Sequence, residues 1–142
     1  MTVRWWLVLM AVLLAVPAAA GNKDYRSPEK VAGAETIDVL DAERLHEAGV
    51  VFVDVRAPRL HKRQHIPGSV HLDLNSRFTA EELAKVVDKD QPFVLYCSGV
   101  TCTRSFRAAA RAVRWGYTGV KYFRGGVVDW RDAGLPLTKA SS

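Results

Sequence analysis

The sequence predicts an α/β domain, a small parallel β-sheet flanked by helices on both faces. Residues 50–55 (VVFVDV) form an uninterrupted β-branched and aromatic run, which is typical of a strand covered on both faces. Residues 93–96 (FVLY) form a second such run, and the apolar residues of 106–113 recur at helical spacing after it. Strands that alternate with helical segments favour parallel pairing, since parallel strands need long crossover connections.

Weaker patterns predict the remaining elements in chain order. Short strands are expected at residues 36–39, 70–72 and 120–123, and helical segments at 41–48, 58–64, 104–115 and 127–133. Thr79 and Glu82 have the spacing of a capping box, which predicts a helix over residues 79–87. Pro67 and Gly68 suit a type II turn. Glycines at 49 and 116 are placed to end the helices before them.

The N-terminal residues have the pattern of a secretory signal peptide. Residues 1–4 supply a short charged start, residues 5–16 an apolar run, and residues 17–20 (PAAA) a small-residue end. We expect residues 1–20 to be a signal peptide cleaved after Ala20, and the protein to be exported, periplasmic or secreted. An apolar run of 12 residues is short of the ~20 that span a bilayer, so no stable membrane insertion is expected after cleavage. The alternative is an uncleaved anchor over residues 3–20.

Length and charge narrow the classes of function. A chain of 142 residues is expected to form one domain once its leader is set aside. We assign residues 21–33 to an exposed lead-in, 34–138 to the domain, and 139–142 to a polar tail. The net charge of +5 is spread along the chain and not interleaved with aromatic residues. This pattern favours attraction of small anions over a nucleic-acid partner.

A cysteine lies at the predicted crossover from a strand to a helix. Cys97 follows the apolar strand directly, and a helix is predicted to begin at Arg104. Unpaired backbone amides at a helix N-terminus favour anions and shift a nearby thiol toward the nucleophilic thiolate. We therefore predict Cys97 as a catalytic nucleophile. The loop predicted to cradle an anionic substrate consists of Ser98, Gly99, Val100, Thr101, Cys102, Thr103 and Arg104.

Simpler interpretations of the same residues stay open. Cys97 can be a small buried hydrophobic residue that ends a strand. Arg111 and Arg114 continue a basic stripe from Arg104, and a solvated helix face accounts for such a stripe. Cys102 lies five positions after Cys97, and in an oxidising compartment the two thiols can form a disulfide.

Polar residues near the first buried strand are candidates for a supporting role. Asp54 lies near the carboxyl end of the strand, where active sites collect in open α/β sheets. A buried aspartate needs partners, and Arg56 lies two residues on, on the same face. A structural ion pair explains the two residues as well as a direct catalytic role does. The chain's four histidines lack the spacing of a metal site, and His46 and His61 are expected on the surface.

Several motifs together resemble the rhodanese (thiosulfate sulfurtransferase) family, in a single-domain exported form. They are FVDVR at 52–56, HIPGS at 65–69, YC at 96–97 with RS at 104–105 and AA at 108–109, and FRGG at 123–126 with Trp130 and GLP at 134–136. The match covers residues 34 to 138, and four motifs in order make it specific. The resemblance implies a rhodanese-like fold.

The resemblance also implies a sulfurtransferase that works without a cofactor. Cys97 would attack the outer sulfur of a small anionic donor such as thiosulfate, release sulfite, and pass the sulfur from a persulfide to a thiol or cyanide acceptor. Arg104 would help to bind the donor. Two departures put substrate choice in doubt: the loop is larger than the family's simple loop, with six residues between Cys97 and Arg104, and it contains Cys102.

The sequence is therefore consistent with three functions. The first is sulfur transfer through Cys97. The second is thiol–disulfide redox chemistry by Cys97 and Cys102, where Cys102 can also resolve a persulfide by attack or be a bystander. The third is a non-catalytic rhodanese-like binding module that uses the cradle to hold an anion or a peptide.

Overall fold

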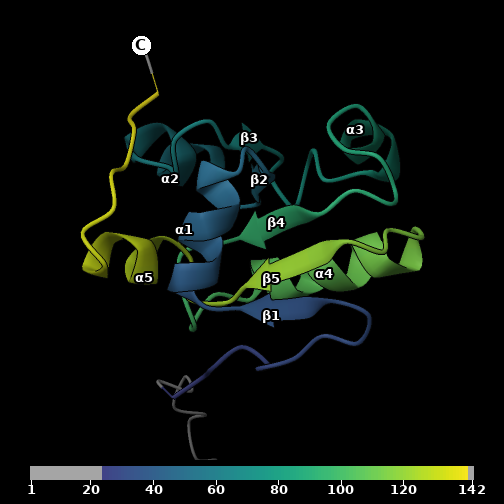
Figure 1. Ribbon diagram of the computed structural model, residues 1–142, viewed down its shortest axis with the longest axis horizontal. Helices are drawn as coiled ribbons and strands as arrows, with labels where there is room; N and C mark the ends of the chain where they lie inside the picture. The colour runs from purple at the N-terminus through teal and green to yellow at the C-terminus, as the bar shows by residue number, and fades with distance from the viewer. Residues whose placement is uncertain (1–23, 141–142) are drawn as a thin grey trace, which may run out of the picture.

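The computed structural model describes residues 24–140 and contains a five-stranded sheet in the order β1-β5-β4-β2-β3. Figure 1 shows the central strands side by side. The strands are β1 (Glu35–Ile37), β2 (Val51–Asp54), β3 (Val70–His71), β4 (Phe93–Tyr96) and β5 (Val120–Phe123). All four strand pairings are parallel, which confirms the predicted fold class.

Among residues 24–140, four helices connect the strands and a fifth follows β5. They are α1 (Val39–Glu47), α2 (Pro58–Arg63), α3 (Ala80–Ala84), α4 (Arg104–Arg114) and α5 (Gly126–Asp132). Helix α3 is shorter than the predicted 79–87, because the amides of Val86 and Val87 both turn back to the carbonyl of Leu83. The Thr79 hydroxyl accepts from the Glu82 amide at 3.1 Å, as predicted, but the Glu82 carboxylate pairs with Arg77 and Lys85 and does not complete a capping box.

The sheet separates two apolar cores. Alternate residues of β2 and β4, among them Val53 and Leu95, pack with α3 and α4 on one face. The opposite residues, such as Phe52 and Val94, pack with α1, α5 and Ile66 on the other face. All of β4 is buried, and so is β2 except for the partly buried Val51, as runs without polar alternation predict.

The carboxyl ends of the central strands lie level with one another. In the sheet register Asp54 is opposite Tyr96, and Tyr96 is opposite Phe123. Strand β4 lies between β2 and β5, so the loop that follows it emerges at the middle of this edge. Cys97, the first residue of that loop, is therefore surrounded by the segments that follow β2 and β5.

The segment before β1 is closer to the sheet than a wholly exposed lead-in would be. Most of residues 24–34 are exposed, but Ser27 is buried and its amide donates to the carbonyl of Val100 at 2.7 Å. The predicted signal peptide, residues 1–20, lies outside the described residues. Among residues 24–140, none of the helices has the length and apolar character needed to cross a bilayer.

Candidate active site

Cys97 and Cys102 form a disulfide within the loop that joins β4 to α4. Their Cα atoms are 6.3 Å apart. Cys97 lies on the α4 side of the sheet and is only 2% exposed, whereas Cys102 is partly exposed. The two cysteines thus meet in the oxidised state, and the pairing that the spacing left open is present. In this state neither sulfur is a free nucleophile.

Helix α5 fixes the start of the loop. The amides of Val127 and Val128 donate to the carbonyls of Cys97 and Ser98, at 3.1 and 2.9 Å. This close approach requires glycine at position 126, where φ is +54° and an added Cβ would lie 2.3 Å from the Cys97 carbonyl oxygen. The FRGG motif therefore positions the backbone of Cys97.

The segment before β1 fixes the far side of the loop. Arg124, directly after β5, donates from Nε and a terminal guanidinium nitrogen to the Ser27 carbonyl, at 3.0 and 2.7 Å. Ser27 in turn donates its amide to the Val100 carbonyl. Within the loop, the Cys102 amide donates to the Gly99 carbonyl at 3.0 Å. Three parts of the chain that are distant in sequence thereby hold the loop between the cysteines.

Most of the loop's other amides have no hydrogen-bond acceptor within the described part of the chain. Among residues 24–140, the amides of Ser98, Gly99, Val100, Thr101 and Thr103 donate to no protein acceptor. Thr103 precedes α4 without a capping side-chain hydrogen bond, and the first turn of α4 carries no acidic residue. Unpaired amides beside a helix N-terminus form an environment that favours an anion. Which reactant they hold remains a prediction.

Arg104 is tied to the sheet edge. Its guanidinium donates to a carboxylate oxygen of Asp73 and to the Val55 carbonyl, the latter at 3.2 Å. Burial would raise the pKa of Asp73, but hydrogen bonds from the Asn75 amide and from Arg104 outweigh it and lower the pKa. Arg104 therefore anchors α4 to the segments after β2 and β3. Its predicted contact with a donor anion remains a prediction.

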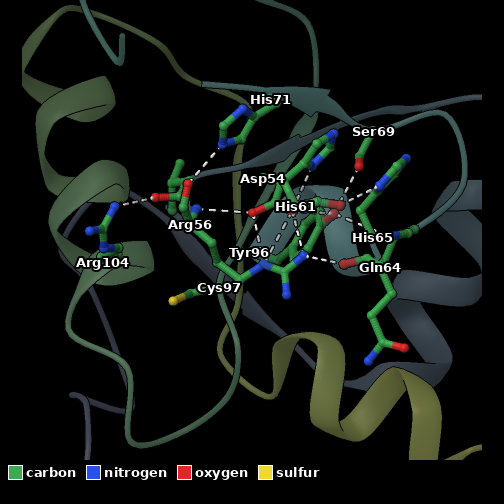
Figure 2. Close-up of polar contacts among 12 residues, drawn as sticks. Asp54, Arg56, His61, Gln64, His65, Ser69, His71, Tyr96, Cys97 and Arg104 are labelled. Carbon is green, nitrogen blue, oxygen red and sulfur yellow. Dashed lines mark hydrogen bonds and ion pairs between the residues drawn. The ribbon is translucent and has the colours of Figure 1, made fainter. Parts of the chain in front are cut away.

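Asp54 and Arg56 form a buried polar network behind the loop. Arg56 donates its backbone amide and two guanidinium nitrogens to the Asp54 carboxylate, at 2.7 to 3.2 Å. The Tyr96 hydroxyl donates to the same carboxylate at 3.2 Å and accepts from the Ile66 amide. Figure 2 shows these side chains together, with the Cys97 sulfur pointing away from them. The predicted ion pair between Asp54 and Arg56 is present, and its carboxylate accepts from Tyr96, the residue before Cys97.

The network keeps the Asp54 carboxylate ionised. Burial would raise the pKa of Asp54, but the hydrogen bonds and charge of Arg56, with a hydrogen bond to His61, outweigh burial and lower this pKa. Burial raises the pKa of Tyr96 far above its ordinary value, so its hydroxyl stays protonated. A protonated hydroxyl is the form that can donate to Asp54.

Two histidines predicted on the surface are only partly exposed. His61 Nδ1 lies 2.9 Å from Asp54 Oδ2, and its ring stacks between those of His65 and His71, at centroid distances of 3.9 and 4.4 Å (Figure 2). Burial lowers the pKa of His61, with a further lowering from the neighbouring histidines. His46 packs against the rings of Phe52 and Trp130. Both side chains therefore lie at the surface only in part, because their rings pack against other side chains.

Sequence reasoning also missed Asp73, Ser27 and Arg124, which fix α4 and the cysteine loop. Asp73 follows β3 as Asp54 ends β2, so an acidic residue after a short strand was a usable signal. Arg124 lies in the FRGG motif. Nothing in the local sequence indicated Ser27, because its contacts with Val100 and Arg124 span more than 70 residues.

A hollow of about 360 Å³ adjoins the loop on the side of β1 and β5. Its lining includes Val100 and Arg124, together with the carboxylates of Asp38, Asp41 and Asp129. These carboxylates disfavour a small dianion in the hollow. The loop's amides that lack a protein acceptor are the more favourable position for an anion.

The fold and the motifs of this site define one protein family. A family model described as "Rhodanese-like domain" matches residues 38–133. The chain therefore belongs to the rhodanese-like family, as its motifs predicted.

Proteins similar to this chain include named sulfurtransferases. The "Thiosulfate sulfurtransferase GlpE" of Pseudomonas syringae is 39% identical over 90 residues, which cover 63% of this chain and 80% of that protein. A crystal structure of BH2092 from Bacillus halodurans superposes with a TM-score of 0.66, at 27% identity, over 75% of this chain and 77% of the other. A Rhodopseudomonas palustris protein described as a possible tyrosine phosphatase has 34% identity and a TM-score of 0.62, with coverage of 75% and 86%.

Proposed function

We propose that this protein is a sulfurtransferase that moves a sulfane sulfur from a small anionic donor, such as thiosulfate, to a thiol or cyanide acceptor through a Cys97 persulfide. The observation that carries the proposal is the position of Cys97, between the end of β4 and a loop of unpaired amides before α4. Membership of the rhodanese-like family and similarity to proteins named thiosulfate sulfurtransferase support it.

The reaction would proceed by two displacements. The Cys97 thiolate attacks the outer sulfur of thiosulfate, a sulfur–sulfur bond forms, and sulfite leaves with the electron pair of the broken bond. Cyanide then attacks the outer sulfur of the persulfide, forms thiocyanate and restores the thiolate. Amides that stabilise the thiolate and the charged persulfide would favour both steps. None of these steps requires a cofactor.

Reduction of the disulfide is a condition for this activity. Because Cys97 is bonded to Cys102 in the structure, the oxidised protein has no thiolate with which to attack a donor. We expect thiocyanate formation from thiosulfate and cyanide by protein that has been reduced and then freed of reductant, and none by oxidised protein. Equal rates of thiocyanate formation by the two forms would contradict the proposal.

The disulfide also favours a second candidate, a thiol–disulfide exchange protein. The cyanide assay separates the two candidates, because sulfur transfer to cyanide leaves the protein's redox state unchanged and can turn over many times. An exchange protein would instead reduce a disulfide substrate such as insulin in the absence of any sulfur donor. Insulin reduction without thiocyanate formation would select the second candidate.

We also propose that the protein is exported. The leader pattern of residues 1–20 supports this, and a structural pairing of two cysteines suits an oxidising compartment. The mass of the protein recovered from the periplasm or medium of producing cells tests the proposal. A mature chain beginning at Gly21 is expected, and full-length protein confined to the cytoplasm would contradict export.

A further inference from the structure

Cys102 lies in the one loop through which Cys97 would have to exchange sulfur. The disulfide is present in a domain in which β4 before the loop and α4 after it are both formed. The sulfur of Cys102 can therefore reach that of Cys97 without unfolding of the domain. Hydrogen bonds hold the loop from both sides, through Val127 to Cys97 and through Ser27 to Val100. The conformation that brings the two cysteines together is thus stabilised by contacts with the rest of the domain.

We propose that Cys102 is a further catalytic residue, which resolves the Cys97 persulfide and makes the protein release sulfide from its donor. This inference rests on the proposed sulfur transfer to Cys97. After sulfite has left, the Cys102 thiol gives its proton to the outer sulfur of the persulfide, and its sulfur attacks the inner sulfur, which is Cys97 Sγ. The Cys97–Cys102 bond forms, the bond to the outer sulfur breaks, and the outer sulfur leaves with the electron pair of that bond and the proton, as hydrosulfide.

The electrons for this step come from the two cysteines. The outer sulfur leaves reduced as hydrosulfide, while the two thiols become the disulfide that the structure contains. A second turnover needs a dithiol reductant, which returns two electrons and two protons to the pair. With such a reductant, the net reaction converts thiosulfate and a dithiol to sulfite, sulfide and a disulfide.

Position decides which group attacks each sulfur. In the disulfide form Cys97 is 2% exposed and its Sγ atom is bonded to Cys102, so the Cys102 thiol is the neighbour of the inner sulfur of a persulfide. Cys102 is in the same loop and attacks as an intramolecular nucleophile, with the advantage that a fixed neighbour has over a dissolved reactant. Cyanide attacks the outer sulfur, whereas Cys102 attacks the inner one. Sulfide release and thiocyanate formation are therefore two outcomes of one persulfide.

The difference in exposure between the two cysteines explains how the disulfide is reduced again. Cys102 is the partly exposed member of the disulfide, so a dithiol reductant attacks its sulfur and displaces Cys97 as the thiolate. The leaving thiolate is released beside the amides of the loop, which favour its charge. Reduction thereby regenerates the nucleophile that the next donor molecule needs.

A single turnover without external thiol tests the assignment. Reduced protein is freed of reductant without oxygen, mixed with excess thiosulfate, and assayed for sulfite, for sulfide and for intact mass. Wild-type protein is expected to release about one equivalent each of sulfite and sulfide per chain and to lose the mass of two hydrogen atoms. Cys102→Ser is expected to release the sulfite, release no sulfide and gain the mass of one sulfur atom.

Cys102→Ala is the second variant, because it removes the thiol without placing a hydroxyl in the loop. Both variants should behave alike if the thiol is what matters. Sulfide release by either variant at the wild-type level, or a wild-type protein that keeps its added sulfur with Cys102 still alkylatable, would overturn the role of Cys102. Absence of sulfite from all three proteins would instead overturn the proposed transfer to Cys97, so the two failures are distinguishable.

Discussion

Replacement of Cys97 by serine is expected to lower the rate of thiocyanate formation by about 1,000-fold or more in reduced protein, as loss of a catalytic nucleophile does in other enzymes. The reason is chemical, because a serine hydroxyl is not ionised at neutral pH and cannot carry a persulfide. The measurement is the initial rate with thiosulfate and cyanide, compared with reduced wild-type protein at equal concentration.

A change in folding must be separated from the loss of the nucleophile. Cys97 packs in the core beside α4, so a serine there can lower stability by placing a hydroxyl among apolar groups. Cys97→Ala avoids this hydroxyl and should be equally inactive. The denaturation midpoint of each reduced variant shows that it is folded under assay conditions. Activity of either folded variant near the wild-type rate would contradict the nucleophile assignment.

Arg56→Ala is expected to lower the free energy of unfolding by about 3–5 kcal/mol at neutral pH, because it leaves the Asp54 carboxylate buried without its cation. Asp54 is 0% exposed and accepts hydrogen bonds from three donor nitrogens of Arg56. The measurement is urea unfolding of the reduced protein, followed by circular dichroism. Arg44→Ala is the matched control. Arg44 pairs with Asp41 on an exposed surface, and its loss should change stability by under about 1 kcal/mol.

The pH dependence gives the Arg56 prediction a second readout. In the wild type the pKa of Asp54 lies below 3.8, so the ion pair's contribution is fully present above pH 3.8 and is lost as the pH falls through the lower folded value. Without Arg56, burial raises this pKa. Protonation of Asp54 then removes the buried unpaired charge and raises the variant's free energy of unfolding. The stability gap should therefore narrow as the pH falls toward 3.8. A loss of stability no larger than that of Arg44→Ala, and independent of pH, would contradict this account of Asp54 and Arg56.

The sequence was sufficient for the sheet and for the position of Cys97 in it, because both depend on local patterns. The apolar runs in 50–55 and 93–96 became β2 and β4, since a strand covered on both faces has no polar side to alternate with. A helix at the predicted position followed, beginning at Arg104. Those two facts place Cys97 at a strand-to-helix crossover before any contact is known.

The supporting contacts could not be predicted in the same way, because they join distant segments. The pairing of Arg104 with Asp73 depends on where β3 lies relative to α4. His61 is partly buried because it contacts the carboxylate of Asp54, seven residues earlier, and stacks with two neighbouring histidine rings. The sequence pattern of helix α2 does not indicate these contacts. A propensity for exposed histidine was overruled by tertiary structure in this case.

The most direct test of the central claim is the location of sulfur on the reduced protein after a brief exposure to thiosulfate. Cys102→Ala is suited to it, because this variant is expected to retain the added sulfur. Peptide fragmentation should place the mass of one extra sulfur atom on Cys97, and treatment with cyanide should remove it as thiocyanate. An unmodified Cys97 in folded, reduced protein would contradict the account of this site.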